Sequence, residues 1–237
     1  MSLTFISLFS AASAPGIALL TYFYLKDKYV TEPLHIVLKL FLYGILLVFP
    51  IMVLQRGLMI WLGDNDIVFS FLISGGLEES LKWFILYVAI FTHSVFDEPY
   101  DGIVYAVSVS MGFATLENII YAWAYNADMS MLLLRAFLPV SGHALFGVVM
   151  GYYLGKAKFV KEKKQRFLVY SVLFPVFWHG AFDWIVLNAE AVWSWFIVLF
   201  MLVLWLYGIR KVNLANAKSP FRTVLLEDEI EMRSKSQ

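Results

Sequence analysis

Residues 67–91 read IVFSFLISGGLEESLKWFILYVAIF, two apolar runs with Glu78, Glu79 and Lys82 between them. As a helix rising about 1.5 Å per residue, the stretch is long enough to cross a hydrocarbon core of roughly 30 Å. A charge at the centre of a span costs roughly 2.5–3.5 kcal/mol on insertion scales, so such charges usually face a cavity and carry function. The stretch therefore predicts a membrane-spanning helix that forms one wall of a polar site.

The composition is that of a membrane protein along the whole chain. Of 237 residues, 61% are hydrophobic and only 15% are charged, against roughly one quarter charged in soluble domains. The formal net charge is zero, which provides no basic surface for nucleic acid. The chain has no cysteine, which excludes disulfides and a thiol nucleophile.

Seven apolar segments are candidate spans, and their length favours helices over the shorter, alternating strands of a membrane barrel. They cover residues 3–25, 34–55, 66–92, 101–125, 131–155, 167–187 and 191–208. The first segment lacks a basic leader and stays apolar through Leu25, so we expect it to be a retained span. The sequence thus predicts an all-α, polytopic bundle.

Basic residues indicate how the bundle is oriented. Six lysines and arginines lie between Lys156 and Arg166, more lie beyond Arg210, and two follow the first span. Excess basic charge marks the cytoplasmic side, and seven alternating spans place all three groups on one side. We expect the N-terminus outside and the C-terminus inside, with residues 1–210 as the membrane domain and 211–237 as a polar, loosely ordered cytoplasmic tail.

Small residues recur at every fourth position in two of the predicted spans. Gly147, Gly151 and Gly155 form one such row. The matching row in the preceding span consists of Gly102, Ala106, Ser110 and Ala114. Because small residues let membrane helices approach closely, we expect these two faces to pack tightly against neighbouring helices.

Ionisable side chains recur in four consecutive predicted spans. They are Glu78, Glu79 and Lys82, then Glu117, then His143, and finally His179 and Asp183. In the predicted orientation, one group from each span lies about 8–12 residues from the outer end of that span. These groups are Glu78, Glu117, His143 and His179. One shared site that opens toward the outer face is therefore compatible with their depths. Gly75 and Pro139 precede two of these groups and predict kinks beside the site.

The charges of the predicted span 66–92 suggest different roles for its two glutamates. On a helix, Lys82 points between Glu78, about 40° away, and Glu79, about 60° away. Two neighbouring carboxylates in a low dielectric resist joint ionisation. We therefore expect Lys82 to pair with one glutamate and to leave the other to accept a proton.

The two histidines have helical neighbours that bear on their roles. Asp183 lies four residues after His179 and can hold the tautomer of its imidazole. His143 shares a face with Gly147, which leaves room for a substrate or another helix. Arg135, near the outer end of the same span, is expected to extend its guanidinium to the membrane surface.

Other interpretations of these groups stay open at this point. A buried ion network can simply set helix register, and single histidines often only bond a neighbouring helix. A proton-coupled transporter also places acids and histidines at the midplane, although no internal repeat is seen. Without cysteine or an HExxH motif, glutamate-activated water is the favoured chemistry. A zinc ion held by His143, His179 and either Glu78 or Glu117 is the alternative.

Taken together, the four clusters resemble one known family. EESLK at 78–82, FATLE at 113–117, HALFG at 143–147 and HGAFD at 179–183 are similar to the EExxK, FxxxE, HxxxG and HxxxD motifs of the PrsW family. These are bacterial intramembrane proteases, distantly related to the type II CAAX prenyl proteases. The N-terminal APGIALLTYFYLKD also looks like this family.

The resemblance implies a multi-pass protein of the bacterial plasma membrane. It implies site-1 cleavage of a single-span anti-sigma factor on its extracytoplasmic side, which begins regulated proteolysis and releases a stress-response sigma factor. No cofactor and no nucleic acid is part of this interpretation, and the partners are the substrate and the lipid bilayer.

The resemblance also implies residue roles. Glu78 is the implied base, Glu117 a second water-binding group, and His179 with Asp183 the oxyanion side. The other implied members of the site are Glu79 and Lys82, which organise the base, and Phe113, His143 and Gly147. This chain departs from the prenyl proteases at two of these positions, since they have histidine in place of Glu117 and commonly asparagine in place of Asp183.

Overall fold

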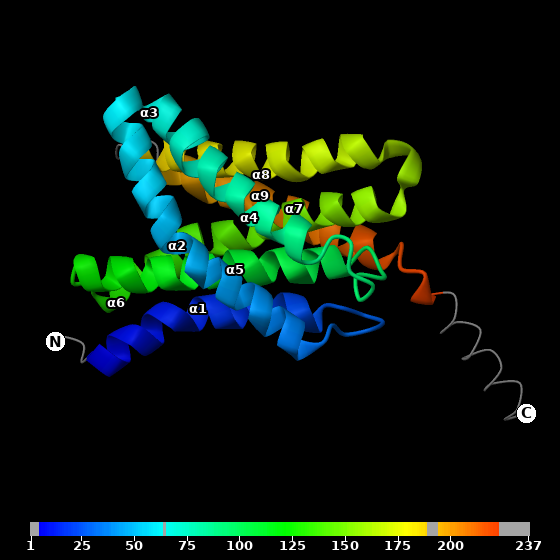
Figure 1. The fold of residues 1–237 in the computed structure, drawn as a ribbon. Helices are drawn as coiled ribbons and strands as arrows, with labels where there is room; N and C mark the ends of the chain where they lie inside the picture. Colours follow the sequence, from blue (N-terminus) through cyan, green and yellow to red (C-terminus); the bar gives the residue numbers. More distant parts are fainter. Residues whose placement is uncertain (1–4, 64, 189–193, 223–237) are drawn as a thin grey trace, which may run out of the picture.

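A computed structural model describes residues 5–63, 65–188 and 194–222, and in this part of the chain the regular structure is entirely helical (Figure 1). The long helices are α1 (Phe5–Leu25), α2 (Leu34–Leu62), α5 (Asp101–Ala124), α7 (Ser141–Phe159), α8 (Lys164–Leu187) and α9 (Ser194–Asn216). The shorter elements are α3 (Asp66–Val68), η1 (Phe69–Ser74), α4 (Gly75–Ala89), α6 (Met129–Arg135), η2 (Ala136–Val140) and η3 (Lys161–Lys163). The predicted all-α class is confirmed.

Six helical segments of the described chain are long and apolar enough to cross a membrane, and each corresponds to a predicted span. The remaining predicted span, 66–92, appears as consecutive helical elements α3, η1 and α4, from Asp66 to Ala89. It carries the three charges of the opening stretch. The polytopic bundle is therefore confirmed, with six apolar spans and one charged helical segment of similar length.

Two helices extend beyond their predicted ends. Helix α2 continues to Leu62 rather than ending near residue 55, and α9 continues to Asn216, past the predicted domain boundary at 210/211. The end of α9 is anchored because the Asn216 side-chain amide donates to the Lys26 carbonyl at 3.2 Å. Residues 189–193 and the tail from residue 223 lie outside the described residues, and the division into two domains stays a prediction.

Helix α5 forms the centre of the bundle. It packs against α1, α2 and α7, and α7 in turn packs against α8 and α9. A Cβ atom on Gly151 of α7 would overlap the backbone of Gly102 on α5, and one on Gly147 would lie 2.8 Å from the Ser110 hydroxyl. The predicted small-residue contact between these two helices is confirmed, and it lets their backbones approach closely.

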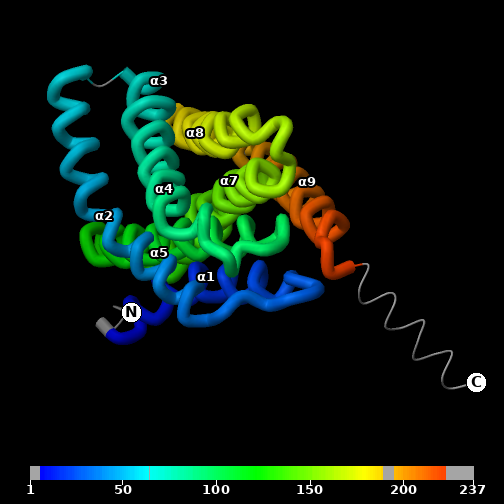
Figure 2. Tube along the Cα trace, turned by 45° about the vertical axis from the view of Figure 1, so that its right-hand side comes forward, coloured from blue at the N-terminus to red at the C-terminus, as the bar shows by residue number. Residues whose placement is uncertain are grey.

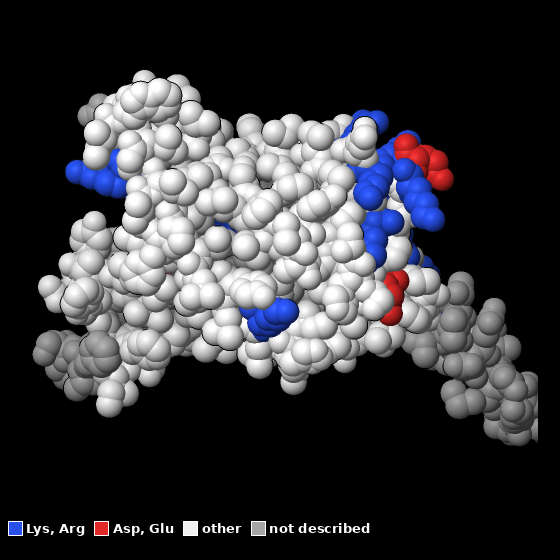
Figure 3. Space-filling view, in the orientation of Figure 1, with Lys and Arg blue, Asp and Glu red and all other residues white. Residues whose placement is uncertain are grey.

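Basic side chains gather at one end of the molecule. Figure 3 shows most of the visible lysine and arginine at the right-hand end, where Figure 1 places the turn between α7 and α8. The loops after α1 and α4 and the end of α9 lie at the same end. We refer to it as the basic end. Its assignment to the cytoplasmic side stays a prediction from the distribution of charge.

Candidate active site

Helix α4 reaches the site by packing closely on α8. The two elements run side by side in Figures 1 and 2 and are in contact. A Cβ atom on Gly75 would lie 2.8 Å from the Gly180 amide nitrogen, and one on Gly180 would overlap the Phe71 ring. Glycine at both positions therefore permits the approach that brings Glu79 Oε1 to 2.9 Å from His179 Nδ1.

Two π-helical turns precede the site residues. Element η1 ends at Ser74, one turn before Glu78, and η2, which contains Pro139, ends at Val140, just before His143. Such turns widen a helix locally, re-aim the side chains that follow, and occur frequently at functional sites. The kinks expected beside Gly75 and Pro139 take this form.

Lys82 lies at the centre of the polar groups and is completely buried. Its ammonium donates to Glu78 Oε2 at 3.2 Å and to Glu79 Oε1 at 2.9 Å, and lies 3.2 Å from His143 Nδ1. The ring centroid of Phe113 lies 4.0 Å from the same nitrogen. The expectation that Lys82 pairs with only one glutamate is wrong, because glutamates three and four residues earlier on one helix can both reach it.

These contacts determine the tautomer of His143. A lysine ammonium has three donors and no acceptor, so His143 Nδ1 must accept from Lys82. The neutral ring then carries its proton on Nε2, which lies 3.3 Å from Glu117 Oε2. His143 therefore presents an N–H donor on the side away from Lys82.

In His179, by contrast, Nδ1 is the donor. The Glu79 carboxylate can only accept, so His179 Nδ1 donates to Glu79 Oε1 and the neutral ring leaves Nε2 with a lone pair. That Nε2 lies 3.4 Å from Asp183 Oδ2 and 4.0 Å from Glu78 Oε2. The ring stacks on Phe146, with centroids 4.9 Å apart and planes at 17°. Glu79, rather than the predicted Asp183, thus orients the imidazole through Nδ1.

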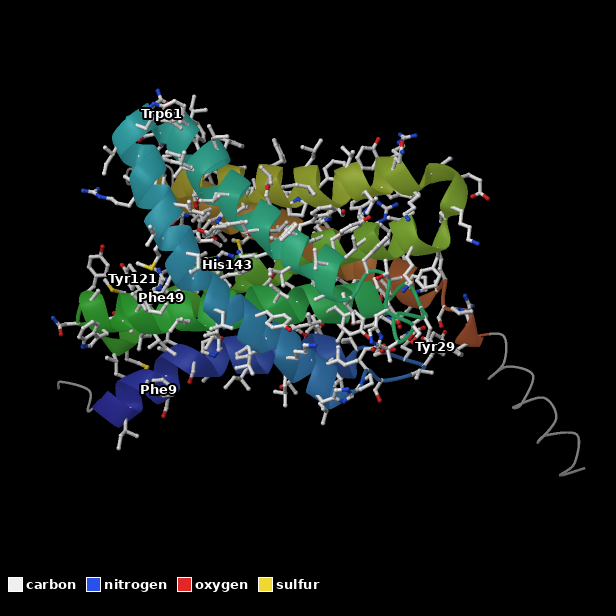
Figure 4. The ribbon with its side chains drawn as sticks, in the orientation of Figure 1. Phe9, Tyr29, Phe49, Trp61, Tyr121 and His143 are labelled. Atoms are coloured by element: carbon white, nitrogen blue, oxygen red, sulfur yellow. The ribbon has the colours of Figure 1, made fainter. Side chains whose placement is uncertain are left out.

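A cavity of about 290 Å³ opens onto these groups. The ionisable side chains that line it are Glu78, Glu117, Arg135, His143, His179 and Asp183. Glu79 and Lys82 lie behind this wall and are fully buried. Other lining residues, among them Tyr121 and Val186, come from the ends of α5 and α8. The cavity therefore opens toward the end opposite the basic end, and Figure 4 shows His143 in the interior with Tyr121 further toward that opening.

Two residues contribute to the site without having been predicted there. The Gln55 side-chain amide of α2 donates to Glu78 Oε1 at 3.0 Å. Arg135 does not extend to the membrane surface as expected: its Nη2 lies 3.7 Å from Glu117 Oε2 and its guanidinium carbon 3.9 Å from the Tyr121 ring centroid. Arg135 is eight residues before His143, a spacing that places both on one face of a regular helix. The sequence therefore already indicated that Arg135 could reach the site.

Gly147 is the predicted site residue that lies away from the cavity. Its open face contacts Ala106 and Ser110 of α5, so it serves helix packing. Phe113 lies between α5 and the Lys82 ammonium, and its ring packs edge-on to His143 at 5.6 Å. The structure therefore brings together every predicted ionisable residue and separates only the glycine.

The carboxylate and imidazole groups of the site are also potential metal ligands. One ligand atom from each of Glu78, Glu79, His143 and His179 lies within 4.8 Å of the others, but the Lys82 ammonium already bonds three of these residues. On the cavity side, His179 Nε2 lies 4.0 Å from Glu78 Oε2 and 3.4 Å from Asp183 Oδ2. Imidazole with carboxylates suits zinc, and Glu79 on Nδ1 is the orienting carboxylate that metal-bound histidines commonly have. The donor types on this side suit a metal ion.

Fold and site together define a polytopic membrane protein with a carboxylate and imidazole centre inside its helical bundle. The sequence model of the family described as PrsW family intramembrane metalloprotease matches residues 32–207. The chain therefore belongs to the PrsW family of intramembrane proteases, which confirms the resemblance seen in the four motifs.

Individual relatives agree with this assignment. The chain is 52% identical to "Protease PrsW" of Geobacillus kaustophilus, over 89% of this chain and 92% of that protein. It is 50% identical to "Protease PrsW" of Bacillus subtilis, over 89% and 96%, and 34% identical to that of Clostridioides difficile, over 79% and 82%. No solved structure matches. The protein is a multi-pass membrane peptidase.

Proposed function

We propose that this protein is an endopeptidase of the bacterial plasma membrane that makes the site-1 cut in a single-span anti-sigma factor and so begins the release of a stress-response sigma factor. Membership of the PrsW family supports the peptidase activity. The cavity supports the side of cleavage, because it opens opposite the basic end, which the charge distribution predicts to be cytoplasmic.

The proposed nucleophile is a water molecule between Glu78 and His179. Glu78 Oε2 and His179 Nε2 are 4.0 Å apart, a separation that lets one water lie about 2.8 Å from each. Gln55 and Lys82 hold the Glu78 carboxylate in place. In the proposed step the water oxygen attacks the scissile carbonyl carbon, and Glu78 takes the proton and later delivers it to the leaving amine.

The proposed oxyanion donor is His143. Its Nε2–H points into the cavity because Lys82 occupies Nδ1, so a substrate carbonyl that displaces Glu117 would accept this hydrogen bond. This assignment differs from the role implied by the prenyl proteases, which places His179 and Asp183 on the oxyanion side. The contact between the Lys82 ammonium and His143 Nδ1, which leaves Nε2 as the donor on the cavity side, is the single observation that carries it.

Glutamate-activated water is proposed without a required cofactor, and zinc is the alternative. If a metal ion is bound, we propose His179, Glu78 and Asp183 as its ligands in place of the His143, His179 and Glu78 or Glu117 set expected from the sequence, because Lys82 bonds His143 Nδ1. The ion would acidify a bound water and polarise the carbonyl. In either case Glu79 and Lys82 keep the two imidazoles in their tautomers.

The test is cleavage of a single-span anti-sigma factor by the full-length protein in proteoliposomes. We expect Glu78→Gln to lower the cleavage rate by roughly 10²–10⁴-fold, the range of a lost general base. The matched control is Glu162→Gln, which changes an exposed glutamate of the α7–α8 turn and should cleave normally.

Each outcome bears on one part of the proposal. Full activity of Glu78→Gln would overturn the assignment of the base. Loss of activity with chelator and recovery with zinc would select the metal-dependent form. If the wild type cleaves other single-span membrane proteins but no anti-sigma factor, the substrate class is wrong while the peptidase remains.

A further inference from the structure

A second group of buried carboxylates lies at the basic end, far from the cavity. Asp27 and Glu32 belong to the loop between α1 and α2, Glu98 to the loop after α4, and Asp101 is the first residue of α5. We call these four residues the acidic cluster. Figure 4 labels Tyr29, of the same α1–α2 loop, at this end of the molecule.

The members of the acidic cluster are close together and shielded from solvent. One carboxylate oxygen from each of Asp27, Glu32 and Asp101 lies within 4.8 Å of the other two. The exposed fractions are 9% for Asp27, 4% for Glu32 and 0% for both Glu98 and Asp101. These short distances between buried oxygens show that the carboxylates surround a common centre and are not spread over the protein surface.

Several oxygens of the cluster have no donor. Asp101 Oδ2 accepts from the backbone amides of Asp97 and Glu98, both at 2.8 Å, and the Tyr105 hydroxyl donates to Glu32. Asp101 Oδ1, Asp27 Oδ2 and both oxygens of Glu98 receive no hydrogen bond of normal geometry, although the Ser219 hydroxyl lies near Glu98. The Asp27 side chain also lies near Glu98, but a buried carboxylate whose oxygens receive no hydrogen bond of normal geometry points to a missing ligand.

Positive charge is also missing. In the described ranges, no lysine, arginine or histidine forms an ion pair with any member of the acidic cluster. Lys158 is the nearby base on α7, but its ammonium donates to the His93 carbonyl at 2.6 Å. Buried like charges without a counter-ion are strongly unfavourable, so either protons or a cation must neutralise them.

We propose that the acidic cluster is a binding site for one hard divalent cation, Mg²⁺ or Ca²⁺, held by carboxylate oxygens of Asp27, Glu32 and Asp101 with Glu98 as a further ligand. Carboxylates are the ligands that both ions prefer. The site is separate from the proteolytic centre, which lies toward the other end of the same helices.

A cation at this position would tie together two segments that are distant in sequence, residues 27–32 and residues 98–101. The cluster joins the α1–α2 loop, the loop after α4 and the start of α5. The end of α9 is attached to the same place, since Asn216 bonds the Lys26 carbonyl and Asn216 Oδ1 has no partner of its own. The bound ion would therefore stabilise the basic end of the bundle.

The test uses the full-length protein in detergent, freed of metal with chelator and then titrated with Mg²⁺ or with Ca²⁺. We expect one-to-one binding by calorimetry and a rise in melting temperature of roughly 5–10 °C at a hundredfold excess over the dissociation constant. The ion with the larger effect identifies the resident cation. Titration with KCl at equal ionic strength controls for general screening.

Variants show where the ion binds. Asp101→Asn and Glu98→Gln keep the shape of the cluster and remove charge, so we expect both to fold and to lose at least tenfold in cation affinity. Glu162→Gln is the matched surface control. Asp183→Asn, in the cavity, should leave binding at the acidic cluster intact, which separates this site from a metal in the proteolytic centre.

Three results would overturn the proposal. The first is the absence of heat and of any melting shift with either ion up to millimolar concentration. The second is an undiminished shift in Asp27→Asn/Asp101→Asn. The third is a stability that responds to acidification alone, which would mean that protons neutralise the cluster. None of these results depends on proteolytic activity, so the proposed function can fail or stand independently.

Discussion

The protein contains two groups of buried carboxylates, one at each half of the bundle, and they are neutralised in different ways. At the cavity, the Lys82 ammonium bonds both Glu78 and Glu79, and Arg135 approaches Glu117. In the acidic cluster the described chain supplies no such base. The first group carries its own counter-ions, whereas the second must take a cation or protons from its surroundings.

The two groups of acids differ in neutralisation because one lies within a helix and the other lies mainly in loops. The glutamates of α4 are three and four residues before a lysine on the same helix, so one ammonium can serve both. The acidic cluster instead draws its members from two loops and one helix start, where no helical repeat provides a partner. A buried acid that belongs to a helical motif can thus be paired locally, while acids that meet only through loops depend on an external ligand.

Removal of the internal counter-ion should produce the largest effect. Lys82→Met keeps most of the length of the side chain but leaves two buried carboxylates without their ammonium counter-ion and frees His143 Nδ1. We expect loss of roughly 10²–10⁴-fold in cleavage rate and destabilisation of about 3–5 kcal/mol. Cleavage in proteoliposomes and unfolding in detergent measure the two effects.

The control for this variant is Lys161→Met, at an exposed position of the α7–α8 turn, which should behave as wild type. An active and stable Lys82→Met protein would remove the contrast between the two groups of acids.

Replacement of the proposed oxyanion donor should have the second-largest effect. His143→Phe retains a ring and removes the Nε2–H that faces the cavity. We expect kcat to fall by roughly 10²–10³-fold with little change in KM, as for the loss of one oxyanion donor. His35→Phe, at an exposed position of α2, is the matched control. An increase in KM alone would assign His143 to substrate binding instead.

A lysine placed in the acidic cluster should give that cluster an internal counter-ion, as Lys82 does for the glutamates at the cavity. Glu98→Lys supplies an internal ammonium beside Asp27, so we expect the melting temperature in chelator to rise by several degrees and the response to divalent cations to disappear. Thermal unfolding with and without Mg²⁺ or Ca²⁺ tests this. A variant that still gains the full wild-type shift would show that the cation binds elsewhere.

The smallest effect is expected at an exposed acid. Asp128 caps α6, the helix that carries Arg135, and its hydrogen bonds from the Met131 amide and the Ser130 hydroxyl hold its pKa below the usual range. A lowered pKa stabilises the fold above the unfolded value of about 3.9, and this contribution is lost as the pH falls through the folded value.

Asp128→Ala should therefore lower the melting temperature slightly at neutral pH, and this difference should shrink as the pH falls below the unfolded value of about 3.9 and disappear below the folded value. A variant that melts lower by the same amount at neutral pH and below the folded value would show that the cap acts through packing rather than through charge.

Much of the site was accessible to sequence reasoning. The depths of Glu78, Glu117, His143 and His179 along their spans predicted one shared centre, and the structure places all four around one cavity. The contacts of Lys82 with both glutamates, the position of Arg135 and the hydrogen bond from Gln55 were not predicted. Each depends on how one helix is rotated against another, which the helical repeat of a single segment does not specify.

The acidic cluster is the clearest case of a feature that could not be predicted from the sequence. Asp27, Glu32 and Glu98 lie in stretches predicted only as connections between spans, and nothing in their local sequence indicates that they meet.

By itself, the sequence determined the all-α class, the apolar spans, the family motifs and the approximate depth of the ionisable groups, because length and hydrophobicity decide what a bilayer accepts. Only the tertiary structure decided which nitrogen of each histidine faces the cavity and that acids from separate loops share one buried space. Hydrogen bonds and like-charge contacts act over a few ångströms between residues far apart in the chain, so they exist only once the helices have packed.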